Sequence, residues 1–245
     1  MKRPSIYPLM LLLLLPAAGC RKYSGEKAAA ERAAWHDAIR DSITEISARR
    51  HSDSLRLAGL HASLAEELPR FTQIGNPREV EPYYILSSFK ASYPLTSTGI
   101  AARMTASEQY ELIAALSGSR FDAIRVTAGG ASAESDVVPA DQALNYTAAG
   151  LTTVAFSGAR ADSIGELVKA NAAGPVTLEY LSAGRRVGSV TLSGAQKDWL
   201  STTWSVCGAH SEAQRLERSL MVDARKIQLM EMRLRQEGEK AAGSE

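Results

Sequence analysis

The chain has 245 residues, and its 28 lysines and arginines nearly balance its 27 aspartates and glutamates, for a formal net charge of +1. This balance indicates no polyanionic partner such as nucleic acid. The aromatic content of 6% argues against a large carbohydrate-binding or base-stacking surface. The length suits one or two domains.

Residues 1–19 have the pattern of an export signal. Lys2 and Arg3 give a positive start, an apolar run extends from Leu9 to Leu15, and Pro16 is followed by the small residues Ala-Ala-Gly. The apolar run is shorter than the roughly 20 residues that a membrane-spanning helix needs. The segment therefore predicts a signal peptide that is removed from the mature protein.

The run of small residues ends at Cys20, so the segment resembles the lipobox of bacterial lipoproteins. In that family the cysteine thiol receives a diacylglyceryl group, and cleavage makes the cysteine a new N-terminus that is acylated as well. The resemblance implies that Cys20 is the lipidation site and that residues 20–25 form a short tether on a membrane. Ala17 stands where the family prefers leucine, and an ordinary secretory signal is the alternative. Lipidation of Cys20 would leave Cys207 without a disulfide partner.

The residues after Cys20 bear on location within the cell envelope. Arg21 and Lys22 follow the cysteine, and no acidic residue stands directly after it. In lipoproteins, acidic residues there signal inner-membrane retention or surface export, so their absence favours an outer-membrane lipoprotein that faces the periplasm. The body of the chain is similar in style to lipoproteins of the Bacteroidetes and resembles no family of known activity.

Two long helices are expected at the ends of the mature chain, over residues 26–70 and 194–237, with a disordered tail at 238–245. Apolar residues recur every three or four positions in both segments, which predicts one apolar stripe on each helix. Such stripes favour pairing of the helices as an antiparallel coiled-coil stalk, with Ile39 facing Ile227. A parallel homo-oligomer through one helix is the alternative, and the oligomeric state stays open.

The middle, residues 71–193, is expected to be a β-rich domain because short alternating segments are separated by Gly- and Pro-marked turns. A short helix is predicted over Ala161–Ala170, and a hairpin around Ser182–Arg185. The expected strands are Tyr83–Lys90, Thr98–Met104, Gln109–Ser117, Ala123–Ala128, Ser132–Val138, Ala143–Thr147, Leu151–Phe156, Val176–Leu181 and Val187–Leu192. The predicted fold class is α+β, with an antiparallel, sandwich-like middle domain between two long helices.

The sequence predicts no catalytic residue, no cofactor and no metal site. Ser87-Ser88-Phe89-Lys90 matches the Ser-x-x-Lys of penicillin-recognising enzymes, but it lies in an expected strand and lacks the partner motifs of that family. The histidines at 36, 51, 61 and 210 do not have the spacing of a zinc helix. Cys207 lies on the apolar stripe of the last helix, where an inert buried thiol is expected.

The function expected from these features is that of a non-enzymatic envelope lipoprotein, which presents a small β domain on a helical stalk to an envelope protein or glycan. One alternative is a glycan- or peptide-binding module, with Tyr83, Tyr84 and Tyr93 as ligand contacts. Another is a hydrolase whose catalytic residues are dispersed along the chain.

Overall fold

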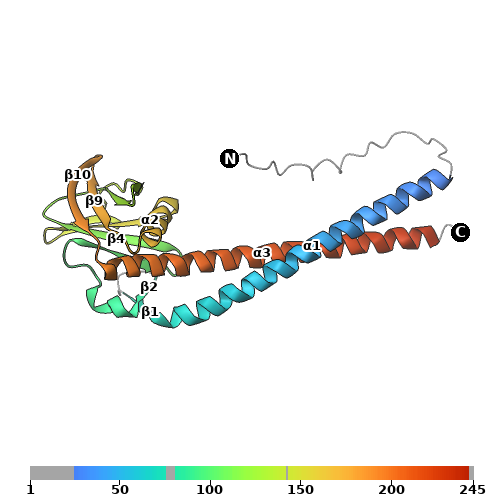
Figure 1. Ribbon diagram of the computed structural model, residues 1–245, viewed down its shortest axis with the longest axis horizontal. Helices are drawn as coiled ribbons and strands as arrows, with labels where there is room; N and C mark the ends of the chain where they lie inside the picture. Colours follow the sequence, from blue (N-terminus) through green and yellow to red (C-terminus); the bar gives the residue numbers. More distant parts are fainter. Residues whose placement is uncertain (1–24, 76–80, 142, 243–245) are drawn as a thin grey trace. The chain divides into compact units, whose positions relative to one another are not determined.

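The computed structural model describes residues 25–75, 81–141 and 143–242. It is a mixed α+β structure with two antiparallel sheets, a long N-terminal helix and a long C-terminal helix (Figure 1). The described residues fall into two compact units, of which residues 49–225 form one and the segments 25–48 and 226–242 form the other. Each long helix therefore contributes one segment to each unit.

The strands lie between the two long helices in the sequence and are interrupted by η2 and by α2. The helices are α1 (Gly25–Glu67), η1 (Leu68–Arg70), η2 (Ser87–Ser92), α2 (Ala159–Ala170) and α3 (Gly194–Ala242), of which η1 and η2 are 3-10 helices. The strands are β1 (Phe71–Ile74), β2 (Tyr83–Leu86), β3 (Gly99–Met104), β4 (Tyr110–Ser117), β5 (Ala123–Ala128), β6 (Ala131–Glu134), β7 (Asn145–Ala148), β8 (Leu151–Ser157), β9 (Val176–Ser182) and β10 (Arg185–Thr191).

The ends of the long helices have clear local causes. α1 contains no proline over its 43 residues and gives way to η1 at Pro69, whose ring cannot continue an α-helix. At the start of α3, Gln196 N donates to Ser193 Oγ at 3.2 Å, and Ser193 N donates to Gln196 Oε1 at 2.9 Å. This reciprocal pair of hydrogen bonds is a capping box with Ser193 as the N-cap residue. α3 then runs to Ala242, so residues 238–242, expected in the disordered tail, are helical.

The strands form a six-stranded sheet in the order β1-β2-β3-β4-β8-β7 and a four-stranded sheet in the order β10-β9-β5-β6. All neighbouring strands are antiparallel. The predicted hairpin joins β9 to β10 through Ala183 and Gly184, which have φ angles of 49° and 75°. Positive φ at both central positions is the geometry of a tight two-residue hairpin turn.

Residues of both sheets meet in one hydrophobic core. The Phe121 ring lies 6.4 Å from the Phe156 ring of β8 and 5.0 Å from the Tyr180 ring of β9. Tyr180 Oη donates to the carbonyl of Gly99 in β3 at 2.9 Å, which satisfies a fully buried hydroxyl. The contact therefore joins the four-stranded sheet to the six-stranded one.

The first half of α3 belongs to the same core. Trp199, Leu200, Val206 and Cys207 are buried, as is Leu64 near the end of α1. The Trp199 ring stacks on Phe89 of η2 with 4.5 Å between the ring centroids. The core of this unit therefore extends beyond both expected boundaries of the middle domain, residues 71 and 193.

α2 packs closely against α3. A Cβ atom placed on Gly165 of α2 would lie 2.5 Å from Cδ1 of Trp204 in α3, far inside van der Waals contact. Gly165 thus allows a helix approach that no other residue permits without displacement of Trp204.

Within the unit of residues 49–225, ion pairs join α1 to α3. Arg49 donates to Asp223 through Nη2 at 2.8 Å and Nε at 3.0 Å, and Arg56 lies 2.8 Å from Glu212. Arg56 and His61, whose partner is Glu217, both pair with α3 residues of lower number than Asp223, the partner of Arg49, which is the order of antiparallel segments.

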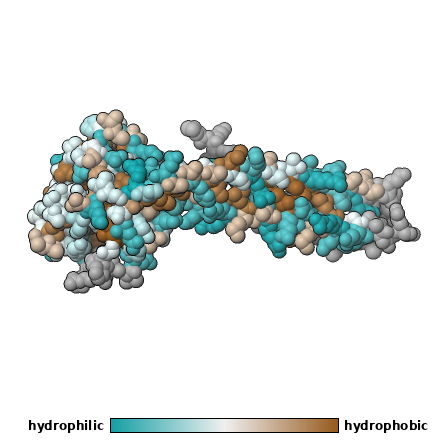
Figure 2. Space-filling view, turned by 90° about the horizontal axis from the view of Figure 1, so that it is seen from below, coloured by the Kyte–Doolittle hydropathy of each residue, from teal (hydrophilic) through white to brown (hydrophobic). Residues whose placement is uncertain are grey.

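In the unit of segments 25–48 and 226–242, no described side chain is fully buried. Ile39, Ile43 and Ile227 of the predicted stripes are half-buried, whereas Trp35 is 36% exposed. Leu229 and Met232 remain 44% and 46% exposed. Apolar side chains lie among hydrophilic ones along the long helices (Figure 2).

In the part of the chain that the structure describes, no helix combines the length and apolar character needed to span a membrane.

Two strand predictions need correction, and one strand was not predicted. β2 stops at Leu86 and the chain turns into η2, which carries Phe89 to Trp199 instead of extending the strand to Lys90. β6 stops at Glu134, so a strand to Val138 is wrong. At Ser135 the regular ladder is interrupted, because Ile124 N donates to Ser135 Oγ at 3.0 Å, while Ser135 N still donates to Ile124 O at 2.9 Å. β1 was not predicted, because four residues directly after a helix carry too little alternation.

Candidate functional site

Two charged residues stand opposite each other in otherwise apolar strands of the six-stranded sheet. Arg103 of β3 pairs in register with Glu111 of β4, and Arg103 Nε donates to Glu111 Oε2 at 2.5 Å. Both residues are buried, with 8% and 7% of their surface exposed. Alternation along the strands places them on the same face of the sheet as Ile113, whose neighbours on that face include Ala155 of β8.

Two of the three predicted ligand-contact tyrosines converge on Arg103. Its Nη1 donates to Tyr93 Oη at 2.8 Å, and its Cζ lies 3.3 Å from the centroid of the Tyr83 ring. A guanidinium over an aromatic face is a favourable cation–π arrangement, and it is stronger where water is excluded. Tyr83 and Tyr93 therefore hold the guanidinium from two sides.

Burial by itself lowers the pKa of the Arg103 guanidinium, but the charges and hydrogen bonds of Tyr93 and Glu111 outweigh it and raise the pKa overall. Arg103 is therefore a permanent cation on this face of the sheet, and the Glu111 carboxylate balances its charge. The arrangement is suited to orienting polar ligand groups, not to moving protons.

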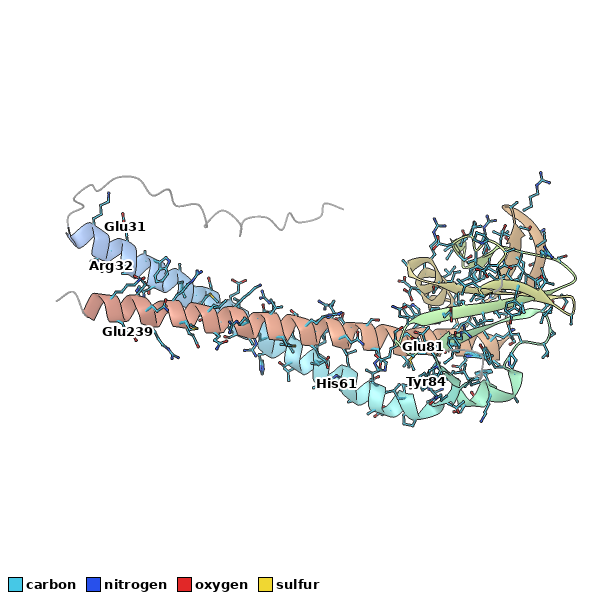
Figure 3. The ribbon with its side chains drawn as sticks, turned by 180° about the vertical axis from the view of Figure 1, so that it is seen from behind. Glu31, Arg32, His61, Glu81, Tyr84 and Glu239 are labelled. Atoms are coloured by element: carbon cyan, nitrogen blue, oxygen red, sulfur yellow. The ribbon has the colours of Figure 1, made fainter. Side chains whose placement is uncertain are left out.

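Tyr84 does not join this cluster. It follows Tyr83 directly in β2, so its side chain points to the opposite face of the sheet, where it pairs with Met104 and packs partly buried against the core (Figure 3). The prediction of Tyr84 as a ligand contact is therefore not supported by its position.

A groove of about 410 Å³ lies on the face that carries Arg103. Ile113 and Thr153 line it together with Arg103, and Tyr93 borders it. Tyr146 of β7 and Leu144, two residues before it, border the groove as well. Their side chains are 45% and 46% exposed. An apolar hollow with a few polar groups and exposed large side chains is typical of a binding site for a small molecule or a short chain.

Sequence reasoning missed Arg103, Glu111 and Tyr146. One signal was present, because an arginine inside Gly-Ile-Ala-Ala-Arg-Met and a glutamate inside Tyr-Glu-Leu-Ile-Ala-Ala-Leu are unusual in segments that read as buried strands. Their pairing could not be predicted, since it depends on the register of β3 against β4. Tyr146 gave no signal, because its place on the groove depends on the pairing of β7 with β8.

The remaining candidates have defined surroundings. Cys207 is buried, and burial together with the negative charges of Asp162 and Glu108 raises its pKa to about 12. His210 Nδ1 lies 3.1 Å from Glu108, and His61 Nε2 lies 3.3 Å from Glu217 (Figure 3 labels His61 on α1). Across the described ranges, no group of three metal-ligating side chains is placed to hold an ion. Cys20 lies outside the described residues.

The Ser-x-x-Lys tetrapeptide lies in η2, not in the strand where it was expected.

Comparison of the chain with family models, with curated proteins and with solved structures gives no match.

Proposed function

We propose that this protein is a non-enzymatic lipoprotein of the bacterial cell envelope, anchored by lipid on Cys20, whose two long helices carry a sandwich-like β domain. The observation that carries the proposal is the leader, in which a positive start and a short apolar run end in Ala-Ala-Gly-Cys. Several acyl chains on one N-terminus hold a protein firmly on a membrane, whereas one chain gives only marginal binding.

The proposal includes an antiparallel coiled-coil stalk formed by α1 and α3. Three kinds of observation support it. The pairs Arg49–Asp223 and Arg56–Glu212 run in antiparallel order, and several apolar stripe positions of both helices are half-buried. The lowered pKa of Glu237, which Lys240 causes mainly and to which His36 and Arg32 of α1 contribute, also supports proximity of the two helices in their outer segments.

Lipid anchoring is tested by metabolic labelling with a palmitate analogue and by membrane fractionation. The wild type should carry the label and sediment with membranes, whereas Cys20→Ser should carry none and appear in the soluble fraction. Cys207→Ser is the matched control and should keep both label and sedimentation. An unlabelled wild type and a Cys20→Ser variant that stays on the membrane would contradict the proposal.

A second candidate function, the binding of a peptide or glycan, is favoured by the groove beside Arg103. It combines an apolar floor, a fixed cation, and aromatic or large apolar side chains at its border, namely Tyr93, Leu144 and Tyr146. Such a lining suits a ligand with an apolar part and at least one polar group that Arg103 or Thr153 can orient.

Groove binding can be tested with a displayed peptide library and a glycan array, both probed with the mature protein. Binders selected by the wild type should lose affinity for Tyr146→Ala, which removes an exposed ring from the groove. Val187→Ala in β10, a comparably exposed apolar residue, should leave them unchanged. If no binder is selected, or if the two variants behave alike, the groove is not a ligand site.

A further inference from the structure

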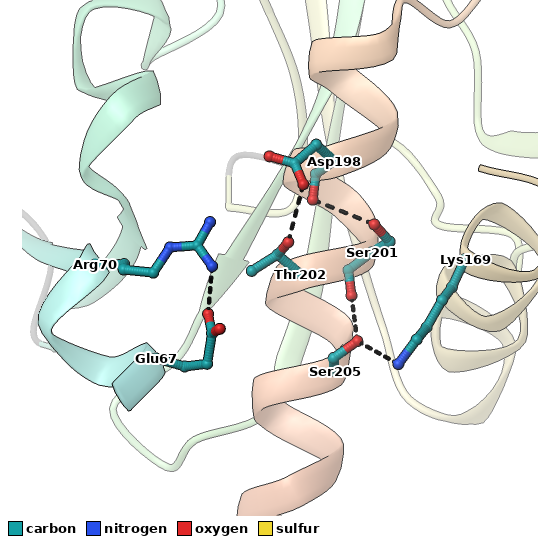
Figure 4. A network of polar contacts seen from close by, with 7 residues as sticks. All are labelled: Glu67, Arg70, Lys169, Asp198, Ser201, Thr202 and Ser205. Carbon is teal, nitrogen blue, oxygen red and sulfur yellow. Dashed lines mark hydrogen bonds and ion pairs between the residues drawn. The ribbon is translucent and has the colours of Figure 1, made fainter. Parts of the chain in front are cut away.

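A second hollow, of about 280 Å³, lies where the end of α1, α2 and α3 meet within the unit of residues 49–225. Its polar lining comes from Ser63 and Glu67 of α1, Arg70 of η1, Lys169 of α2, and Ser201, Thr202 and Ser205 of α3 (Figure 4 shows all but Ser63). The volume equals that of about nine water molecules in the bulk liquid, so it suits a small ion or a short organic molecule, not an oligomer.

Lys169 supplies a cation that the surrounding residues do not neutralise. Its Nζ donates to Ser205 Oγ at 2.9 Å and lies 5.4 Å from the centroid of the Trp204 ring. Among the described residues, no carboxylate forms an ion pair with it. The close packing of Gly165 against Trp204, one turn earlier on α2, fixes the part of the helix from which Lys169 extends.

Arg70 differs from Lys169 because it has its own counter-ion. Its Nη1 lies 2.6 Å from Glu67 Oε2, and both residues line the same hollow. The Arg70–Glu67 pair is neutral as a unit, so one positive charge, that of Lys169, is left over among the lining residues. The Asp198 carboxylate, which does not line the hollow, accepts from Thr202 Oγ1 at 3.3 Å, so the negative charge of a ligand would lie at Lys169 and away from Asp198.

The hydroxyls of α3 can exchange their present partners for those of a ligand. Ser201 Oγ donates to the carbonyl of Asp198 and Thr202 Oγ1 to the Asp198 carboxylate, each at a long 3.3 Å, while Ser205 Oγ donates to the carbonyl of Ser201 at 2.6 Å. A hydroxyl hydrogen rotates freely, so Ser201 can turn to an oxygen placed near Lys169 at the cost of one long hydrogen bond. Thr202 can do so only by giving up its hydrogen bond to the Asp198 carboxylate. Leu64 and Val206 provide an apolar wall beside them.

We propose that this hollow, which we call the Lys169 pocket, binds a small anion with an oxyanion head group, a carboxylate or a phosphate, at the Lys169 ammonium. The α3 hydroxyls donate hydrogen bonds to the remaining oxygens of the head group, and a short apolar part lies on Leu64 and Val206. This binding site is separate from the Arg103 groove, and it does not depend on the lipid anchor.

The test follows the backbone amide resonances of residues 201–205 by NMR in the full mature chain with Cys20→Ser. Sodium butyrate and inorganic phosphate are titrated in parallel at constant ionic strength, with chloride as the reference, so that the two head groups are distinguished. At least one of them should cause saturable shifts of these amides. Lys169→Met should weaken the binding about tenfold or more, the loss expected when a charged hydrogen-bond donor is removed.

Lys169→Arg keeps the charge and should retain most of the affinity. Lys90→Met, a change at another exposed lysine, should leave the affinity unaltered. The proposal is overturned if neither anion shifts these amides beyond the effect of chloride, if the saturable shifts lie elsewhere, or if Lys169→Met binds as the wild type does. Circular dichroism of each variant separates a lost site from a lost fold.

Discussion

At the scale of single residues, the Arg103–Glu111 pair is a buried ion pair inside the six-stranded sheet. The two opposite charges are nearly excluded from water, so water cannot solvate either charge if the other is removed. Removal of one partner from a buried pair costs about 3–5 kcal/mol, whereas replacement of both by apolar residues is often close to neutral.

We therefore expect Arg103→Leu to lower the free energy of unfolding by about 3–5 kcal/mol, because it leaves Glu111 buried and uncompensated. The double variant Arg103→Leu, Glu111→Leu should recover most of that loss. Urea denaturation of the three proteins gives the coupling free energy. Additive effects of the two substitutions would show that the pair is solvated in solution.

Cys207 gives a prediction about pH. Its raised pKa, about 12, means that the folded protein keeps the thiol protonated far above the ordinary value of 9.0. The unfolded chain releases this proton near its ordinary pKa, so the contribution to stability is complete below about pH 9 and is lost as the pH rises towards 12. At pH 8 the native thiol should not react with Ellman's reagent, and it should react fully in guanidinium chloride. Rapid reaction of the native protein would contradict its burial.

At the scale of elements, α2 is positioned by Gly165. Gly165→Ala should destabilise the protein by about 1–3 kcal/mol, because the added methyl group overlaps Trp204. Gly208→Ala is the matched control, since a Cβ on that helical glycine meets nothing within 4 Å. It should stabilise α3 by about 0.5–1 kcal/mol. Equal effects of the two substitutions in thermal unfolding would refute the close approach of α2 and α3.

The pairing of α1 with α3 can be tested in their outer segments. In a Cys20→Ser, Cys207→Ser background, Ile39→Cys with Ile227→Cys should form a disulfide within one chain, because both positions lie on half-buried stripes. Ile39→Cys with Gln228→Cys should cross-link more slowly, since residue 228 is rotated away by about 100°. Non-reducing gels separate this result from cross-links between chains, which would favour the parallel oligomer.

The elements also show where sequence reasoning stops. Alternation in Ala-Ile-Arg-Val-Thr-Ala predicts β5 with its observed ends, and the missing prolines predict most of α1. The sheet order could not be predicted, because β4 pairs with β8 across β5, β6 and β7. The site was partly predictable, since Tyr83 and Tyr93 stood out in the sequence, but Arg103 becomes their centre only once β3 and β4 are in register.

At the scale of the whole molecule, the cooperative unit is larger than the β-rich segment alone. Trp199, Leu200 and Val206 of α3 fill the core that the strands leave open, and Leu64 of α1 joins them. A fragment of residues 71–193 would expose these contacts, and truncation of one buried Trp to Ala alone costs about 3–5 kcal/mol.

A fragment of residues 49–225 should therefore unfold cooperatively, with dispersed NMR signals in its native state, while residues 71–193 should remain largely unfolded. The comparison uses circular dichroism melts and proton spectra of the two fragments. A stable, cooperatively melting fragment 71–193 would show that the β-rich segment is independent of both long helices.

The central claim is the lipid anchor, and the mass of the protein purified from its native membrane tests it most directly. Intact-mass spectrometry should find a chain that begins at Cys20 and carries the added mass of a diacylglyceryl group and of a further acyl chain on its N-terminus. A chain of unmodified mass, or one that begins at another residue, would contradict the account.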